Sequence, residues 1–165
     1  MKIVTGGQTG VDRAALDVAV ARGIDYGEWC PRGGWAEDFS DPPGVRAKFP
    51  LLRETPLADP AQRTAWNIRD SDMVLILVGD AGTSASAGTM LARQLAHAQG
   101  KPTLVIDLSQ ADAMASASKW IAAQGSRFGA GLRLGIGGPR ESEAPGIYER
   151  AYAFLSALFR TLRTV

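Results

Sequence analysis

Residues 3–23 read IVTGGQTGVDRAALDVAVARG. An apolar run stops at two glycines, a third glycine follows at Gly10, and an Ala-rich segment of helical character begins at once. A strand, a glycine turn and a helix in this order are typical of proteins in which parallel strands are joined by crossover helices. These residues therefore predict an α/β protein.

The rest of the chain repeats this alternation of short strand-like and helical segments. We expect strands at 2–5, 26–30, 73–79, 102–107 and 132–138, and helices at 11–22, 60–69, 88–99, 112–124 and 145–162. Met73 to Val78 are all apolar, which favours a central strand that is buried on both faces. Residues 31–50 are rich in Gly, Pro and Asp, so we expect an irregular functional loop there.

Composition limits the classes of protein that this chain can belong to. Its 165 residues are 45% hydrophobic, enough for one domain over 1–165 with a sizeable core. The 18 basic and 17 acidic residues leave a net charge of +1, so we expect neither a nucleic-acid nor a membrane surface. No signal peptide or membrane-spanning stretch is predicted, and we expect a cytoplasmic protein.

The metal-binding and nucleophilic side chains are few. Cys30 is the single cysteine and His97 the single histidine, so we expect neither a disulfide framework nor a Cys/His metal site. Cys30 follows a predicted strand and is expected to be buried rather than nucleophilic. We expect His97 to be a packing residue on its helix.

The first glycine turn has the features of an anion site. The first N–H groups of a helix lack internal partners and carry the positive end of the helix dipole, so they attract phosphate. Gly6 and Gly7 allow close approach of a ligand, Thr9 adds a hydroxyl, and Gly10 keeps the start of the helix open. The alternative is that a tight turn from strand to helix needs these glycines only to avoid steric clashes, and that Asp12 only caps the helix. The spacing matches neither the phosphate-binding loop of NTPases nor the dinucleotide fingerprint.

A second turn of the same kind follows the apolar strand at 73–79. Ser84, Ser86, Gly88 and Thr89 stand where hydroxyls and free N–H groups can surround an anion. The carboxyl ends of parallel strands share one edge of a sheet, so the two turns would face a common crevice if their strands are neighbours. An ordinary loop with a Ser/Thr helix cap is the alternative.

Charged residues cluster after two other predicted strands. Arg32, Glu37 and Asp38 follow the second strand, and Arg140 and Glu141 follow the last. The planar fork of arginine suits a phosphate, a carboxylate or a purine face. Salt bridges that pin the loops are the alternative for both arginines.

Six segments resemble, in order, the motifs of the molybdenum-carrier protein family. They are TGGQTGVDRAALDVA (5–19), WCPRGGWAEDF (29–39), FPLLRET (49–55), RTAWNIRDSDMVLIL (63–77), SAGT (86–89) and GGPRESEAPGIY (137–148). The resemblance spans nearly the whole chain. It implies a Rossmann-like fold, a nucleotide-like or molybdopterin-type phosphorylated ligand at the strand ends, and a homo-oligomer.

That family is similar to phosphoribohydrolases that release cytokinins from their nucleotides. Their motif P-G-G-x-G-T-x-x-E supplies a glutamate that works beside an arginine of the preceding helix. Gly88 and Thr89 match the G-T pair and Arg63 resembles the arginine, but Ala92 stands in the place of the glutamate. A methyl group cannot transfer a proton. Hydrolysis would therefore need a carboxylate from another loop, for which the candidates are Glu37, Asp38, Asp80 and Glu141.

We therefore expect a single-domain Rossmann-like α/β protein with a parallel sheet and helices on both faces, which binds a phosphorylated heterocyclic ligand without turning it over. The ligand would be the molybdenum cofactor, molybdate or a nucleotide, and the protein a dimer or tetramer. A phosphoribohydrolase with a displaced carboxylate and a regulatory nucleotide sensor are the alternatives. The expected ligand-binding residues are Gly6, Gly7, Gln8, Thr9, Gly10, Arg32, Arg63, Asn67, Ser86, Gly88, Thr89 and Arg140; the catalytic candidates are Arg63, Glu37 and Asp38.

Overall fold

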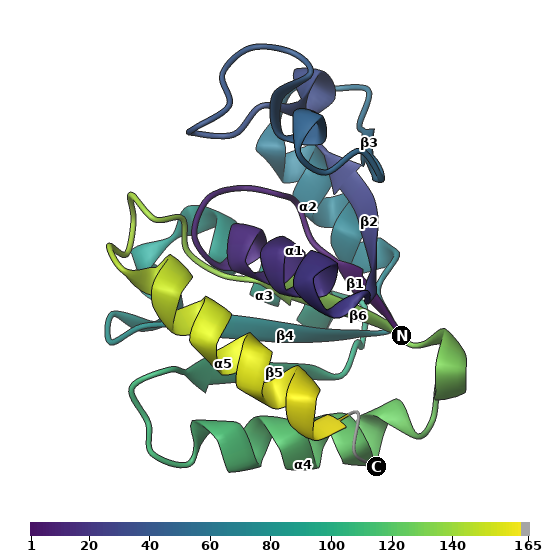
Figure 1. The fold of residues 1–165 in the computed structure, drawn as a ribbon, viewed down its shortest axis with the longest axis vertical. Helices are drawn as coiled ribbons and strands as arrows, with labels where there is room; N and C mark the ends of the chain where they lie inside the picture. Colours follow the sequence, from purple (N-terminus) through teal and green to yellow (C-terminus); the bar gives the residue numbers. More distant parts are fainter. Residues whose placement is uncertain (163–165) are drawn as a thin grey trace.

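A computed structural model of the protein describes residues 1–162, without the side chains of Ala85 and Ala130. Its strands are β1 (Lys2–Val4), β2 (Asp25–Cys30), β3 (Leu52–Glu54), β4 (Met73–Val78), β5 (Thr103–Asp107) and β6 (Arg133–Gly137). They form one parallel sheet in the order β3-β2-β1-β6-β4-β5 (Figure 1). The predicted α/β class with a parallel sheet is confirmed.

The helices cover both faces of the sheet, as expected. They are α1 (Val11–Arg22), α2 (Pro60–Arg69), α3 (Ala87–Ala98), α4 (Ala113–Gly125) and α5 (Ile147–Leu162). Buried side chains of α1, α4 and α5 pack with β1, β4 and β6 in one core cluster, while Ile68 of α2 and Ala96 of α3 pack on the opposite face of β4 (Figure 1). The ten predicted helices and strands are present, with ends that differ by at most two residues.

β4 is buried on both faces because its side chains alternate between the two cores. Met73, Leu75 and Leu77 belong to the cluster with α1, α4 and α5, and Val74 and Ile76 to the cluster with α2 and α3. The strand is paired on both sides, with β5 and with β6. Its continuous apolar sequence thus reflects an interior strand, as predicted.

Residues 31–59 contain a short strand that the sequence pattern did not reveal. β3 is three residues long and pairs with β2, where Leu52 lies opposite Glu28. The preceding loop has two short 3-10 turns, at Arg32–Gly34 and Gly44–Ala47. These turns touch closely, since a Cβ added at Gly34 would lie 2.1 Å from the carbonyl oxygen of Pro43.

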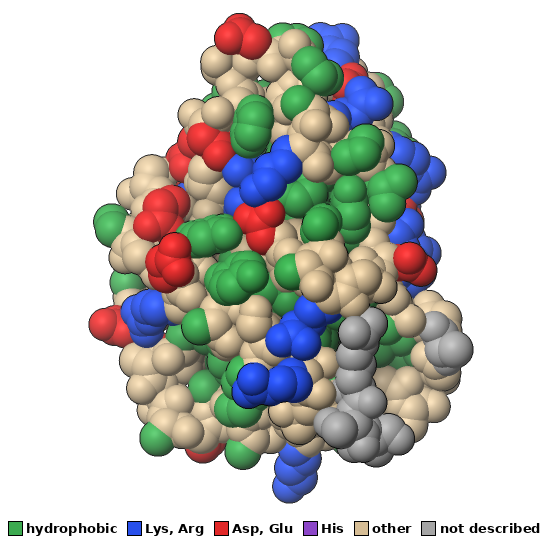
Figure 2. Space-filling view, in the orientation of Figure 1, with side chains coloured by type: hydrophobic (Ala, Val, Ile, Leu, Met, Phe, Trp, Pro, Cys, Tyr) green, Lys and Arg blue, Asp and Glu red, His purple; other side chains and the backbone are tan. Residues whose placement is uncertain are grey.

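The last strand, β6, lies between β1 and β4. The strands that lead into the two glycine turns are therefore not neighbours, contrary to the condition we set for a shared crevice. Figure 2 shows acidic and basic side chains interspersed over one face of the molecule, in agreement with the net charge of +1. Over residues 1–162, no helix has the length and apolar character that a membrane crossing requires.

Candidate ligand-binding site

A cavity of about 260 Å³ lies where the loops after β1, β4 and β6 meet the start of α2. Its polar lining comes from Gln8, Asp12, Arg63, Thr64, Ser86, Thr89 and Arg140. Both glycine turns face this cavity although β6 separates their strands. Gly137 and Gly138 at the end of β6 also line the cavity, and because they have no side chains they leave the space between the two turns free.

The first turn of α3 presents free amide groups to the cavity. Ser86 caps this helix, and its hydroxyl accepts a hydrogen bond from the N–H of Thr89 at 3.2 Å. Within the described part of the chain, the N–H groups of Ala87 and Gly88 have no hydrogen-bond partner. A Cβ added at Gly88 would meet only Ser86 Oγ, at 3.8 Å, so the approach is open. This end of α3 can accept an anion.

Arg63 and Asp12 form a buried ion pair at the cavity wall. Arg63 Nη1 lies 3.2 Å from Asp12 Oδ2, and the two side chains are 12% and 7% exposed. A Cβ at Gly6 would lie 2.1 Å from the Arg63 guanidinium, so only glycine leaves room for this arginine. Burial raises the pKa of Asp12 above its usual value, against the opposing effects of Arg63 and of the Gln8 amide.

Three buried polar atoms of the cavity wall have no hydrogen-bond partner among the described residues. They are Gln8 Nε2, Arg63 Nε and Thr89 Oγ1. An unsatisfied buried polar group costs about 1–3 kcal/mol, so each such group in a folded protein calls for an explanation. Here the three atoms belong to three different segments and line one cavity, which is the arrangement expected where a polar ligand completes the hydrogen bonding.

Three amides in and directly after the glycine turn before α1, in contrast, already have partners. The N–H of Gln8 donates to Asp12 Oδ2 at 3.4 Å, that of Thr9 to Gln8 Oε1 at 3.1 Å, and that of Val11 to the carbonyl of Pro139 at 3.3 Å. The N–H groups of Gln8, Thr9 and Val11 are thus satisfied within the chain, and neither Gly10 nor Val11 lines the cavity. Ala87 and Gly88 are exposed and line it, so α3 is the better candidate for the anion-binding helix.

Packing accounts for the other glycines before α1. A Cβ at Gly7 would lie 3.0 Å from Leu52 and 3.2 Å from Val45, on the side of the core cluster below the 31–50 loop. A Cβ at Gly10 would lie 2.3 Å from the carbonyl oxygen of Pro139. Both residues also have positive φ, 76° and 71°. The steric alternative raised for these glycines therefore explains Gly7 and Gly10.

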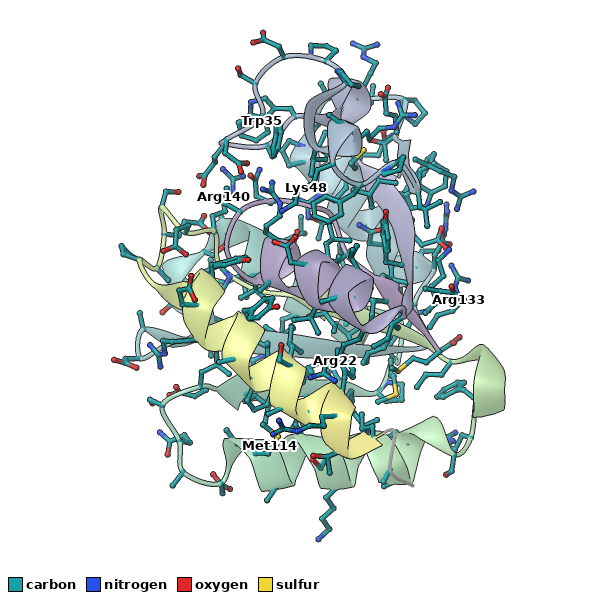
Figure 3. All side chains as sticks on the ribbon, in the orientation of Figure 1. Arg22, Trp35, Lys48, Met114, Arg133 and Arg140 are labelled. Atoms are coloured by element: carbon teal, nitrogen blue, oxygen red, sulfur yellow. The ribbon has the colours of Figure 1, made fainter. Side chains whose placement is uncertain are left out.

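Arg140 lies at the rim of the cavity within a group of side chains from three loops. Its Nη1 is 3.6 Å from Glu37 Oε1, and its guanidinium carbon is 5.6 Å from the centre of the Trp35 ring (Figure 3). The hydroxyls of Thr9 and Ser142 donate to Glu37. Burial would raise the pKa of Glu37, but these hydrogen bonds and Arg140 bring it below its usual value. Glu37 thus holds Arg140 and the loops together.

Several expected ligand-binding residues do not line this cavity. Arg32 is exposed, and Asn67 exchanges two hydrogen bonds of 2.9 Å with the backbone of Trp29. Thr9, like Gly7 and Gly10, is absent from the cavity wall. Gly6 and Asn67 line a smaller cavity of about 40 Å³ behind Arg63. The expected residues that the fold brings together are Gln8, Arg63, Ser86, Gly88, Thr89 and Arg140.

The candidate carboxylates also lie outside the cavity. Asp38 pairs with Arg13 at 2.6 Å, and Asp80 with Arg150 at 3.3 Å. Glu141 accepts hydrogen bonds from backbone N–H groups at the start of α5, including that of Tyr148 at 3.0 Å. None of these groups, nor Glu37, lines the cavity.

Asp12 is the carboxylate of the cavity, and sequence reasoning treated it only as a helix cap. Its partner Arg63 is 51 residues away, so no local pattern connects the two. The available signal was an acidic residue in the first turn of an Ala-rich helix, directly after the glycine turn. That signal does not separate a cap from a buried functional group.

The single cysteine is remote from this chemistry. Cys30 is buried under the 31–50 loop and does not line the cavity, as expected. Burial raises the pKa of its thiol to about 11, which leaves it protonated at neutral pH. Among residues 1–162, no group of three His, Cys, Asp or Glu side chains is placed to hold a metal ion.

Comparison with known proteins places the chain in a family. The model of the circularly permutated YpsA SLOG family matches residues 3–159. The chain belongs to this family. A crystal structure described as "Putative molybdenum carrier protein", from Syntrophus aciditrophicus SB, is 35% identical; 95% of this chain and 93% of that chain are covered, with a TM-score of 0.80. No curated protein matches. The expected relation to molybdenum-carrier proteins is confirmed.

Proposed function

We propose that this family member binds a small phosphorylated heterocyclic ligand, such as a nucleotide or a molybdopterin-type compound, without turning it over. The observation that carries the proposal is the convergence of Gln8 Nε2, Arg63 Nε and Thr89 Oγ1, all buried and unpartnered, on one cavity. A ligand with several hydrogen-bond acceptors would satisfy all three. A phosphate group supplies such acceptors.

The phosphate would lie at the start of α3. The free N–H groups of Ala87 and Gly88 and the hydroxyl of Thr89 are donors, and the helix dipole adds positive charge. Arg140 at the rim supplies a cation whose guanidinium also faces Trp35. The heterocycle would extend toward this rim, where an arginine plane and an indole ring can contact a flat ring system.

The solved relative's description as a putative molybdenum carrier makes a molybdenum compound a candidate cargo. Hydroxyl, amide and guanidinium groups line the cavity, and no thiolate or imidazole lies among its described lining residues. Such donors suit the oxygens of molybdate or of a phosphate better than direct ligation of molybdenum by side chains. A molybdenum cofactor would therefore be held through its phosphate and its heterocycle. A cytoplasmic location and assembly into a dimer or tetramer remain predictions.

Replacing Thr89 by valine tests the proposed site. Valine keeps the shape of the side chain and removes the unpartnered hydroxyl, so we expect the free protein to be as stable as the wild type or slightly more stable. Affinity for adenosine 5′-monophosphate should fall about tenfold, because a hydrogen bond to a charged group contributes about 1.5–3 kcal/mol. Isothermal titration calorimetry measures this change.

Thr103→Val is the matched control. Thr103 begins β5, and its hydroxyl donates to the carbonyl of Lys101 at 2.9 Å, away from the cavity. We expect this variant to bind as the wild type does. If Thr89→Val also binds with unchanged affinity, the ligand does not contact the start of α3 and the proposal is wrong.

Hydrolysis of a nucleotide is the second candidate function, because Asp12 and Arg63 lie in the cavity beside Ala92. The reaction would add a water hydroxyl to the sugar carbon and deliver a proton to the departing base. We expect the purified protein to release no adenine above background from adenosine 5′-monophosphate, as measured by chromatography. Release that disappears in both Arg63→Ala and Asp12→Asn would instead establish the hydrolase.

A further inference from the structure

Asp12 is the one carboxylate among the described residues that line the cavity. Its side chain is 7% exposed, and Oδ2 accepts hydrogen bonds from the N–H of Gln8 and from Arg63. These contacts fix the carboxyl group in one orientation. A buried and oriented carboxylate is costly to keep, so its presence in a cavity wall needs an explanation beyond the capping of α1.

The other oxygen of Asp12 faces the end of β6. A Cβ added at Gly137 would lie 3.6 Å from Asp12 Oδ1, an ordinary contact distance. Because residue 137 has no side chain, part of a ligand can occupy that space and reach Oδ1. Gly137 is itself a lining residue of the cavity.

The charge of Asp12 decides which part of a ligand can occupy this space. A carboxylate repels a phosphate, which is held instead by the free N–H groups at the start of α3. The group next to Asp12 must then be a hydrogen-bond donor. Sugar hydroxyls are suitable donors, and carboxylates bind them in other nucleotide-binding α/β proteins.

We infer that Asp12 determines specificity for ligands whose phosphate is attached to a hydroxyl-bearing sugar, because its carboxylate accepts hydrogen bonds from the sugar hydroxyls. The inference rests on the proposed function and names the ligand class of that site. Arg63 Nε, buried and unpartnered beside Asp12, supplies a donor for the oxygen of such a hydroxyl. A cavity of about 260 Å³ is slightly smaller than the usual range for pockets that enclose a whole ligand, which suits a sugar phosphate with the heterocycle at the rim.

Two nucleotides that differ only in the sugar provide the test. Adenosine 5′-monophosphate has both sugar hydroxyls, and 2′,3′-dideoxyadenosine 5′-monophosphate has neither. We expect the wild-type protein to bind the first about tenfold more tightly, which corresponds to about 1.4 kcal/mol. Titration calorimetry on the full chain measures both affinities, and inorganic phosphate serves as the probe without a sugar.

Asp12→Ala should reduce the tenfold preference to about twofold or less, and Asp12→Asn, which keeps one oxygen, should reduce it less. Asp17→Asn is the matched control, because Asp17 is also on α1 but pairs with Lys48 at 2.7 Å outside this cavity. We expect this control to keep the full preference. Circular dichroism and thermal unfolding report whether each variant is folded.

Equal affinity of the wild type for the two nucleotides would overturn the inference whatever the variants do. The full tenfold preference surviving in a folded Asp12→Ala or Asp12→Asn would also overturn it, because the hydroxyls would then be recognised elsewhere. Failure of the proposed function is distinguishable from both results. In that case neither nucleotide nor inorganic phosphate binds the wild type at all.

Discussion

Glu28 shows how a single carboxylate is held in this protein by cations from distant segments. Glu28 is buried and lies beside Lys2, Arg53 and Arg133. Burial would raise its pKa, but the hydrogen bonds from Lys2 and Arg53 bring the pKa below its usual value. These contacts join β1, β2, β3 and β6 at one edge of the molecule. The carboxylate stabilises the fold only while it is ionised.

Asp70 gives a pH dependence that can be measured. The hydrogen bonds from Arg69, followed in effect by that from Trp29, lower the pKa of Asp70 from 3.8 to about 2, although burial opposes them. A lowered pKa means that this contribution to stability is complete above pH 3.8 and is lost as the pH falls toward 2. It is at most about 2 kcal/mol, and less because the Arg69 side chain is 52% exposed.

We expect Asp70→Asn to be less stable than the wild type at pH 6 and to approach wild-type stability near pH 2. Urea unfolding at a series of pH values measures the free energy of unfolding of both proteins. The difference between them at each pH reports on Asp70 alone, because the other carboxylates are the same in both. A difference that stays constant from pH 6 to pH 2 would show that Asp70 does not titrate with a lowered pKa.

The two helices that begin at glycine-containing turns have different roles. The turn before α1 is closed, because the amides of Gln8, Thr9 and Val11 are bonded to Asp12, Gln8 and Pro139. The start of α3 is open, with Ser86 as its cap and two amides free among the described residues. The glycines before α1 bring the chain close to its neighbours, while Gly88 of α3 leaves space for a ligand. Similar local sequences thus serve packing in one case and access in the other.

Replacing Gly10 by alanine tests the packing role of the turn before α1. The added Cβ would lie 2.3 Å from the carbonyl oxygen of Pro139, at a residue with φ of 71°. Gly23 at the end of α1 is the matched control, because its φ is 61° and a Cβ there would meet nothing within 4 Å. Both variants incur the cost of positive φ, but only Gly10→Ala also incurs a steric clash.

We expect Gly23→Ala to destabilise the protein by about 1 kcal/mol. Gly10→Ala should cost a further 1–3 kcal/mol or so, which is about the cost of overpacking a filled site. Chemical denaturation of the two variants measures both values. Equal losses would mean that the loop after β6 yields without cost and that the packing explanation of Gly10 is wrong.

For the molecule as a whole, the cavity depends on the order of the strands. β6 separates β1 from β4, and its glycines at 137 and 138 keep the space between the two turns free. The start of α2 closes the cavity from the opposite face of the sheet and supplies Arg63. A ligand in this cavity would contact segments from most of the chain, so binding should stabilise the entire fold.

Thermal unfolding measures this coupling directly. A ligand that binds only the folded protein, at a hundredfold excess over its Kd, adds about 2.7 kcal/mol to the stability. For a chain of this size, this corresponds to an increase in Tm of about 5–11 °C. We expect adenosine 5′-monophosphate or a pterin phosphate to produce such an increase. If nucleotides, pterin phosphates, inorganic phosphate and molybdate all leave Tm unchanged, the cavity does not bind this class of ligand.

The sequence by itself determined the helices, most of the strands and the parallel α/β class, because hydrophobic periodicity and helix-ending glycines are local properties of the chain. It also identified both glycine turns and Arg63. The sequence pattern did not predict the three-residue strand β3, because Leu52 is its one buried side chain and the strand forms by pairing with β2.

Tertiary structure alone decided the position of β6 between β1 and β4, the bonded amides of the turn before α1 and the open ones of α3. It also paired Asp12 with Arg63 across 51 residues and directed Glu37, Asp38, Asp80 and Glu141 away from the cavity. The physical reason is that a residue's role in a site depends on which partners satisfy its charge and hydrogen bonds. In this protein, those partners come from segments that are distant in the sequence.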